Sequence, residues 1–247
     1  MTAAAQQHFQ DRHIQDRLTI RRANGWLGHL VAFLLGLGLA IAVLAVLSPA
    51  RAEPGYPSLF GYRESRSENL TAFKKWTGTL DRYFREREIK EGSCESSWFN
   101  RCHMRDWKKL LAGLEGKDRL AQLDAVNRHM NRASYIVDPI NYRVPDYWAT
   151  PRQFFNKNGD CEDYAIAKYL SMRSLGLPAS AMRIVVLQDR NLRIAHAVLA
   201  VYLDGRIWIL DNQIRQVVAA ERIRHYRPFY SINEEYWWIH SGKKAVG

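Results

Sequence analysis

One cysteine of this sequence stands in surroundings that suit a reactive thiol. Cys161 follows Gly159 and Asp160, and two more carboxylates, Glu162 and Asp163, come directly after it. The spacing of the residues beyond it predicts a helix that begins at this cysteine. A helix N-terminus carries partial positive charge and free N–H groups, which favour the thiolate form. A cysteine is usually a small, inert core residue, but this polar setting favours a nucleophile instead.

A histidine and an aspartate further along the chain supply the other parts that thiol catalysis needs. His196 opens an apolar, β-rich run, and Asp211 comes directly after the next such run. An imidazole can take the proton of a thiol, and a carboxylate can hold the imidazole in one tautomer and stabilise its charged form. Taken singly, the histidine fits a core or edge position and the aspartate fits a turn. Together with Cys161 they predict the catalytic residues of a cysteine peptidase.

The same two runs predict that the histidine and the aspartate lie close together. The dipeptide Asp204-Gly205 between the runs is a strong signal for a two-residue hairpin turn. In that register Asp211 lies opposite Val198 and diagonally from His196 on the same face. Diagonal neighbours are about 7–8 Å apart, a gap that longer side chains can close. A β-bulge in the hairpin would shift this register.

The carboxylates around the cysteine raise the question of a metal ion. Asp160, Glu162 and Asp163 crowd a single helical turn, where they repel one another and oppose a thiolate. A cation would relieve this repulsion, and hard oxygen ligands in a loop suit calcium. Acidic residues at a helix start are also favoured by the helix dipole with no metal present. These residues alone leave both explanations open, while zinc lacks the clustered His and Cys that it requires.

Helical and β patterns along the chain predict the elements that hold these residues. Helical stripes of apolar residues precede the cysteine, and β-rich runs follow it. Helices followed by an antiparallel sheet define an α+β fold. The prolines within residues 134–159 predict an ordered loop. The expected helices cover residues 70–84, entered through a capping box of Ser65 and Glu68, then 104–114, 120–130 and 161–175; the expected strands cover 183–187, 196–203 and 206–210.

The first 52 residues have the order of an export signal. A polar segment with four arginines precedes an uncharged apolar run at 26–47, and Ser48 to Ala52 supply an A-x-A cleavage pattern. The run is also long enough for a membrane anchor. We therefore expect residues 1–52 to be an export signal or an N-terminal membrane anchor, and residues 53–247 to be the catalytic domain. Either arrangement places that domain outside the cytosol.

Composition and the other two cysteines agree with export. The aromatic content is 12%, with 8 Trp, which favours a packed globule over disorder. The net charge of +11 comes without a zinc-finger spacing or a dense basic stripe, so a solvated basic surface is favoured over nucleic-acid binding. A disulfide between Cys94 and Cys102 is favoured in an oxidising compartment. Two free thiols, or a metal pair completed by His103, are the alternatives.

Four segments of the chain carry a resemblance to a known family. They are Asp146 to Pro151, Gly159 to Tyr169, His196 to Leu199 and Leu210 to Asn212, and the Gly-Asp-Cys-Glu-Asp block is highly specific. Over about residues 60–240 the chain resembles the bacterial transglutaminase-like cysteine proteinases. The resemblance implies a papain-like/transglutaminase-like α+β fold, with the nucleophile at a helix N-terminus packed on an antiparallel sheet. It also implies a triad of Cys161, His196 and Asp211, and calcium held by Asp160, Glu162 and Asp163.

The resemblance further implies a biological role. Members of the family are calcium-dependent periplasmic endopeptidases that cut the N-terminal region of a large, repeat-containing surface adhesin at a di-alanine site. Release of the adhesin promotes biofilm dispersal. An inner-membrane cyclic-di-GMP receptor sequesters the protease through its periplasmic domain. The alternatives are a transglutaminase-type acyl transferase, which passes the acyl group to an amine, and a catalytically inactive calcium-dependent binding module.

Overall fold

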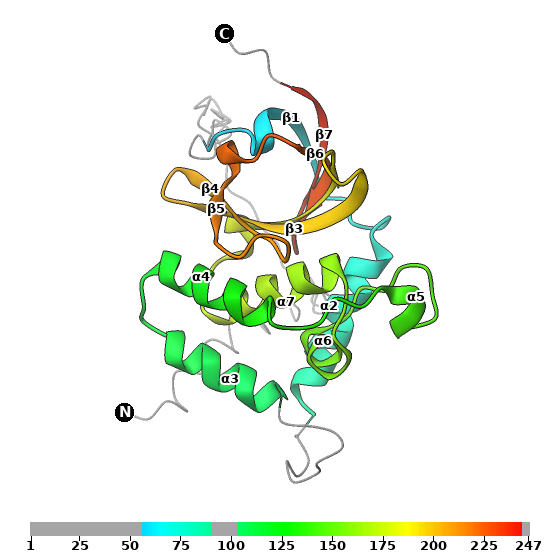
Figure 1. Ribbon diagram of the computed structural model, residues 1–247, viewed down its shortest axis with the longest axis vertical. Coiled ribbons are helices and arrows are strands. Elements are labelled where there is room, and N and C mark those ends of the chain that lie inside the picture. Colours follow the sequence, from blue (N-terminus) through cyan, green and yellow to red (C-terminus); the bar gives the residue numbers. More distant parts are fainter. Residues whose placement is uncertain (1–55, 90–102, 244–247) are drawn as a thin grey trace, which may run out of the picture. The chain divides into compact units, whose positions relative to one another are not determined.

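The computed structural model describes residues 56–89 and 103–243 (Figure 1). A seven-stranded antiparallel sheet has the strand order β1-β7-β6-β2-β3-β4-β5. The strands are β1 (Tyr62–Ser67), β2 (Met182–Asp189), β3 (Ile194–Leu203), β4 (Arg206–Leu210), β5 (Val218–Ala219), β6 (Tyr226–Ile232) and β7 (Trp237–Lys243). The helices are α2 (Lys74–Arg87), α3 (His103–Leu114), α4 (Arg119–Met130), α5 (Asp138–Asn141), α6 (Pro151–Lys157) and α7 (Cys161–Ser174).

The helix that begins at Cys161 is the centre of this arrangement. α7 packs on β2 and β3, α4 and α6 pack on α7, and α3 lies farther from the sheet, against α6 (Figure 1). Nearly every residue of α7 from Asp163 to Met172 is buried. Because a fully enclosed helix has little freedom to shift, its first residue is held firmly relative to the sheet.

Each face of the sheet covers an apolar core. Along β2, alternation directs Ile184 towards the helices and Val185 towards the opposite face. The core under the helices includes Trp76, Leu123, Phe154, Ile166 and Leu199. The core on the other face includes Leu59, Leu187, Val198, Ile209 and Tyr226.

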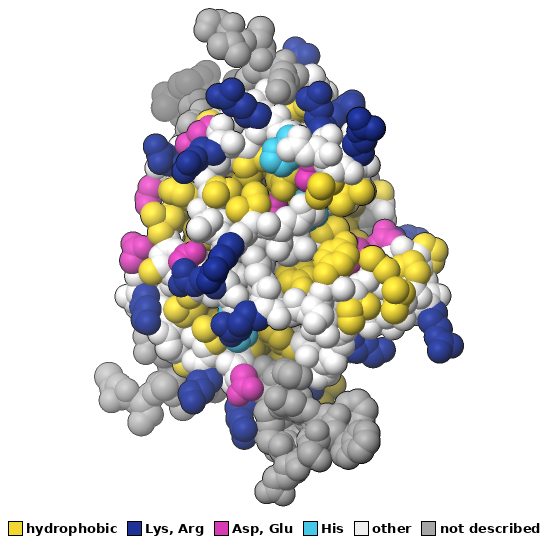
Figure 2. Space-filling view, viewed as in Figure 1, with side chains coloured by type: hydrophobic (Ala, Val, Ile, Leu, Met, Phe, Trp, Pro, Cys, Tyr) yellow, Lys and Arg dark blue, Asp and Glu magenta, His cyan; other side chains and the backbone are white. Residues whose placement is uncertain are grey.

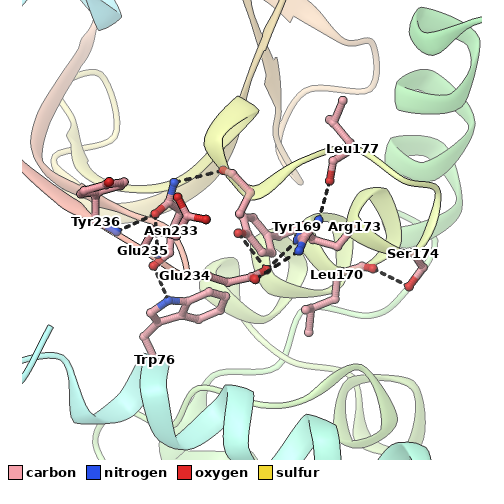
Figure 3. A network of polar contacts seen from close by, with 11 residues as sticks. Trp76, Tyr169, Leu170, Arg173, Ser174, Leu177, Asn233, Glu234, Glu235 and Tyr236 are labelled. Atoms are coloured by element: carbon pink, nitrogen blue, oxygen red, sulfur yellow. Dashed lines mark hydrogen bonds and ion pairs between the residues drawn. The ribbon is translucent and has the colours of Figure 1, made fainter. Parts of the chain in front are cut away.

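A polar network fastens α7 to the turn between β6 and β7 (Figure 3). The carboxylate of Glu234 accepts hydrogen bonds from Arg173 Nε at 2.7 Å and from the Tyr169 hydroxyl at 3.1 Å. The indole of Trp76 on α2 donates to the backbone carbonyl of Asn233 at 2.8 Å. The Asn233 side chain in turn donates to the carbonyl of Ala179. Three elements distant in sequence therefore meet at one turn, which fixes the far end of α7.

The structure confirms several sequence predictions. The helices expected at 104–114, 120–130 and 161–175 are α3, α4 and α7, each within two residues of its predicted bounds. Leu203 pairs with Arg206, and both turn residues, Asp204 and Gly205, have positive φ of 50° and 73°. This is the geometry of a two-residue hairpin turn of type I′. The predicted register of β3 against β4 is therefore correct.

Two local predictions were wrong. The capping box expected at Ser65 and Glu68 does not form, because residues 62–67 pair with β7 as strand β1, and α2 starts only at Lys74. Strand pairing overrides the local signal there. Residues 134–159 are also not a plain loop, since they include α5 and α6. Pro139 and Pro151 lie in the first turns of these helices, where proline loses no hydrogen bond.

Two predictions fall outside the described residues. These are the export signal or anchor within residues 1–52 and the pair Cys94–Cys102. Within 56–89 and 103–243, none of the helices has the length and apolar character that crossing a membrane requires.

Candidate active site

The chain enters α7 through a close approach that only glycine permits. A Cβ on Gly159 would lie 2.1 Å from Oδ2 of Asp163. That oxygen accepts a hydrogen bond from the backbone N–H of Asp160 at 3.3 Å, and Oδ1 accepts one from the backbone N–H of Ala149 at 2.6 Å. The Asp163 carboxylate thus closes over the start of its own helix. This closure places Cys161 at the first helical position, as predicted.

His196 and Asp211 form a buried hydrogen-bonded pair. Nε2 of His196 lies 2.9 Å from Oδ1 of Asp211, and neither side chain is exposed to solvent by more than 1%. Burial works against the charged form of the aspartate. Its hydrogen bonds with His196, Tyr226 and Gln213 nevertheless hold its pKa below the usual value. The structure confirms the prediction from the hairpin register that the side chains of His196 and Asp211 lie within contact distance.

The thiol of Cys161 lies beside the strand that carries the histidine. The backbone N–H of Ala197, the residue after His196, lies close enough to the sulfur to favour the thiolate and so to lower the pKa of the thiol. Burial and the charge of Glu162 act in the opposite direction and raise the pKa of the thiol. The S–H group of Cys161 donates a hydrogen bond to Oε2 of Glu162, with 3.2 Å between sulfur and oxygen. Burial and the neighbouring carboxylates therefore oppose the effect that the sequence predicts for the helix start.

A tyrosine that sequence reasoning missed also reaches the thiol. Tyr135 forms a β-bridge with Gly159, and its ring stacks on Tyr164 of α7 at a centroid distance of 6.5 Å. Its hydroxyl lies close to the thiol, and burial together with the nearby negative charges of Cys161, Asp160 and Glu162 raises its pKa. Tyr135 lies on a loop far from the cysteine motif in sequence, so no local pattern could have identified it.

The predicted carboxylates belong to a larger acidic cluster. Ligand oxygens of Asp138, Asp160 and Asp163 lie within 4.8 Å of one another, and so do those of Asp138, Asp146 and Glu162. The structure therefore adds Asp138 and Asp146 to the residues predicted from sequence. Asp138 opens α5, and its backbone N–H donates to Oδ2 of Asp160 at 3.3 Å. The sequence placed this residue in a loop 22 positions earlier, with no signal for the contact.

The cluster has the electrostatics of a cation site. Burial is the largest cause that raises the pKa of Asp138 to about 6, of Asp163 to about 8 and of Glu162 to about 9, and Asp160 adds to the shift in each. Among the described residues, Oδ1 of Asp138 and Oδ1 of Asp160 are buried without a hydrogen-bond partner. Buried carboxylate oxygens that lack donors fit a hard divalent cation.

A buried lysine follows the cysteine on the same helix. Lys168 is fully buried, and within the described part of the chain its ammonium has no hydrogen-bond partner. Burial lowers its pKa to about 7, against the opposing effect of the Asp211 charge. The Tyr164 ring lies 5.7 Å from the ammonium. This charge therefore faces the aspartate of the His196–Asp211 pair from the side of α7.

Apolar side chains are exposed beside the thiol. Tyr135, Val137, Ile140 and Val144 all reach solvent, and Ile140 on α5 is 76% exposed. Figure 2 shows apolar side chains gathered over the α5 region, while Lys and Arg are spread across this face. Tyr135, which lies close to Cys161, is one of these exposed residues. The apolar surface therefore offers a place where an apolar protein segment can lie next to the thiol.

Comparison with known proteins assigns the chain to a family. Residues 94–243 match the family described as bacterial transglutaminase-like cysteine proteinase BTLCP, which is more than half of the chain. The chain belongs to this family and is a transglutaminase-like cysteine protease. The predicted α+β, transglutaminase-like fold is thereby confirmed.

Solved structures of LapG from Legionella pneumophila are similar to this chain. One shares 30% identity, with a TM-score of 0.53, over 65% of this chain and 87% of that chain. A calcium-bound form shares 29% identity, with a TM-score of 0.54, over 68% and 92%. An EGTA-treated form shares 29% identity, with a TM-score of 0.54, over 68% and 89%. No curated protein matches the chain significantly.

Proposed function

We propose that the chain is a calcium-dependent cysteine endopeptidase in which Cys161 is the nucleophile, His196 its base and Asp211 the group that orients the base. The observation that carries this proposal is the buried His196–Asp211 pair at 2.9 Å, in which the histidine belongs to the strand whose next residue, Ala197, has its backbone N–H close to the Cys161 sulfur. Family membership supports it, because the residues of the pair and the thiol are those expected of a cysteine protease.

The geometry supports a separate role for each of the three residues. Nε2 of His196 is engaged by Asp211, which leaves Nδ1 to exchange a proton with the thiol. After His196 takes that proton, the thiolate attacks the scissile carbonyl, and the backbone N–H of Cys161 at the helix start donates to the oxyanion. His196 then returns the proton to the leaving amine, and water hydrolyses the acyl-enzyme. Nδ1 itself lies 3.5 Å from the side-chain amide nitrogen of Gln213.

Calcium fits the acidic cluster. Asp138, Asp160 and Asp163 would hold the ion, with Glu162 and Asp146 close by. The bound ion would supply positive charge that offsets the mutual repulsion of these carboxylates. The same charge would also attract the nearby Glu162 carboxylate, which accepts the hydrogen bond of the thiol. The calcium-bound and EGTA-treated forms of the Legionella relative support this part of the proposal.

We extend the proposal to substrate, regulation and location by the resemblance to the family. The substrate is the N-terminal region of a large repeat-containing adhesin, cut at a di-alanine site, and its release promotes biofilm dispersal. The inhibitor is the periplasmic domain of an inner-membrane cyclic-di-GMP receptor, and the protease acts in the periplasm. The exposed apolar surface around α5 supports binding of a protein partner next to the thiol.

A single experiment separates these functions. The purified chain is incubated with the N-terminal fragment of a giant repeat adhesin from the same genome, with calcium, and the products are weighed by mass spectrometry. We expect two fragments that sum to the substrate plus one water, and none with Cys161→Ala. Incorporation of an added lysine-like amine would indicate an acyl transferase. No product of either kind, together with intact calcium binding, would indicate an inactive binding module.

A further inference from the structure

Both oxygens of the Asp211 carboxylate are held. Oδ1 accepts hydrogen bonds from Nε2 of His196 at 2.9 Å and from the backbone N–H of Gln213 at 2.8 Å. Oδ2 accepts one from the hydroxyl of Tyr226 at 2.5 Å. The aspartate has 0% exposure, so solvent offers no replacement donor. The orientation of the carboxylate towards the histidine therefore depends on what holds its second oxygen.

The ring of Tyr226 is fixed by packing and not by its hydroxyl. Tyr226 is the first residue of β6, pairs with Asp189 of β2 and is 2% exposed. Its ring meets the Phe60 ring edge-on at 5.6 Å and lies 5.9 Å from the His196 ring. A rigid ring that presents one hydroxyl is well suited to fix a carboxylate in a single rotamer.

Charged and titratable groups approach this carboxylate from three elements. They are His196 on β3, Tyr226 on β6 and Lys168 on α7. Tyr226 itself faces Asp189 on β2, whose carboxylate lies 4.0 Å from His225. Only the tyrosine hydroxyl bonds to Oδ2 among the hydrogen bonds of the described residues. Without it, the carboxylate can rotate and take Oδ1 out of line with the imidazole.

We propose that Tyr226 is a positioning residue, which holds Oδ2 of Asp211 so that Oδ1 faces His196. The inference rests on the proposed function for its catalytic readout. The bond comes from a strand 15 residues beyond the aspartate, outside every motif that the sequence offered. In the absence of the hydroxyl, the imidazole loses its fixed tautomer and orientation, and proton transfer at Nδ1 slows.

The test is a double-mutant cycle on the full chain with calcium. Tyr226→Phe keeps the ring and removes only the hydroxyl, and we expect kcat to fall by roughly tenfold or more with KM nearly unchanged. In an Asp211→Asn background, the same substitution should change kcat by less than about twofold, because residues that act through one another are not additive. Tyr169→Phe is the matched control. It removes a buried hydroxyl that donates to the Glu234 carboxylate at 3.1 Å, away from the pair.

Each outcome decides the matter. Equal losses from Tyr226→Phe and Tyr169→Phe, or full additivity with Asp211→Asn, would overturn the positioning role, since both indicate general destabilisation. Alkylation of Cys161 by iodoacetamide is measured in parallel on all variants. If no variant cleaves any substrate but Tyr226→Phe slows alkylation non-additively with Asp211→Asn, the positioning role stands and the proposed peptidase function fails. Unchanged cleavage and unchanged alkylation would overturn the positioning role alone.

Discussion

Asp138 and Asp160, 22 residues apart in sequence, meet at the acidic cluster through a hydrogen bond of 3.3 Å from the backbone N–H of the first to Oδ2 of the second. Each keeps one buried carboxylate oxygen without a donor among the described residues. The start of α5 is therefore joined to the start of α7 at the point where negative charge is least compensated. A cation at this point would join the same two elements more strongly.

Removal of Asp138 should weaken calcium binding as strongly as removal of a residue in the cysteine motif. We expect Asp138→Asn, Asp160→Ala and Asp163→Ala each to lower calcium affinity by at least tenfold in titration calorimetry, because each removes a charged oxygen ligand. Asp124→Asn, at a half-buried position on α4 where the carboxylate pairs with Arg128, is the control and should bind normally. Normal affinity in Asp138→Asn would remove this residue from the ligand set.

Chelation should stop proteolysis reversibly and lower the melting temperature. A ligand that binds only the folded state stabilises it by mass action. Magnesium should restore little activity, since it requires a tighter octahedral shell and releases water reluctantly. Activity is followed by substrate cleavage before and after EGTA, and again after calcium is restored. Full activity in excess EGTA without a change in melting would contradict a role for the ion.

The gain in stability from calcium should grow with pH. The pKa values of Asp163, about 8, and Glu162, about 9, lie above those of the unfolded chain, near 4. Between these values the folded state binds more protons, so the calcium-free protein loses stability as pH rises. Calcium binds the ionised forms, so its affinity rises over the same range. We expect a larger calcium-induced shift in melting temperature at pH 8.5 than at pH 5.5; equal shifts would argue against ligation by these groups.

Lys168 should impose a pH dependence of the opposite sign. Its pKa is about 7 when folded and 10.5 when unfolded, so between these values the unfolded state binds the extra proton. Stability therefore rises with pH in that window, by up to about 1.4 kcal/mol per pH unit. Lys168→Met should remove this rise when urea unfolding is compared at pH 7.5 and pH 9, with EGTA present throughout. If the free energy of unfolding changed with pH by the same amount in wild type and variant, the lysine would already be paired with a negative charge.

Replacement of the three proposed catalytic residues should give graded losses. Cys161→Ala should abolish cleavage and leave the melting temperature nearly unchanged, because this side chain is only partly buried. His196→Ala should be more damaging than Asp211→Asn, since the histidine moves the proton while the aspartate orients and stabilises. Initial rates with the adhesin fragment give the comparison. A wild-type rate in Asp211→Asn would assign the orienting role to another group.

The sequence was sufficient to predict the parts of the site that depend on residues close together in the chain. The helix start at Cys161 follows from local residue types, and the hairpin turn at Asp204 and Gly205 fixes the register that brings His196 and Asp211 together. The contact between His196 and Asp211 spans 15 residues within one hairpin. Short-range signals of this kind survive folding because no distant partner competes with them.

The sequence was insufficient where distant segments meet. Residues 62–67 had a helix-start signal, but pairing with β7 made them a strand. Asp138 at the start of α5, Tyr135 on the segment before it and Tyr226 on β6 reach the site from parts of the chain that only the complete fold brings close. The raised pKa of the thiol has the same origin. The sequence predicts where the helix starts, and therefore the direction of its dipole. It does not predict how deeply the thiol is buried or that the Glu162 carboxylate points towards it.

The hydrogen bond from Cys161 to Glu162 also bears on the chemical lifetime of the enzyme. Oxidants and electrophiles react with thiolates far faster than with thiols. A carboxylate that accepts the hydrogen bond of the thiol therefore slows sulfenic and sulfinic acid formation at this sulfur. The carboxylate beside the nucleophile thus bears on how long the thiol survives as well as on how readily it reacts.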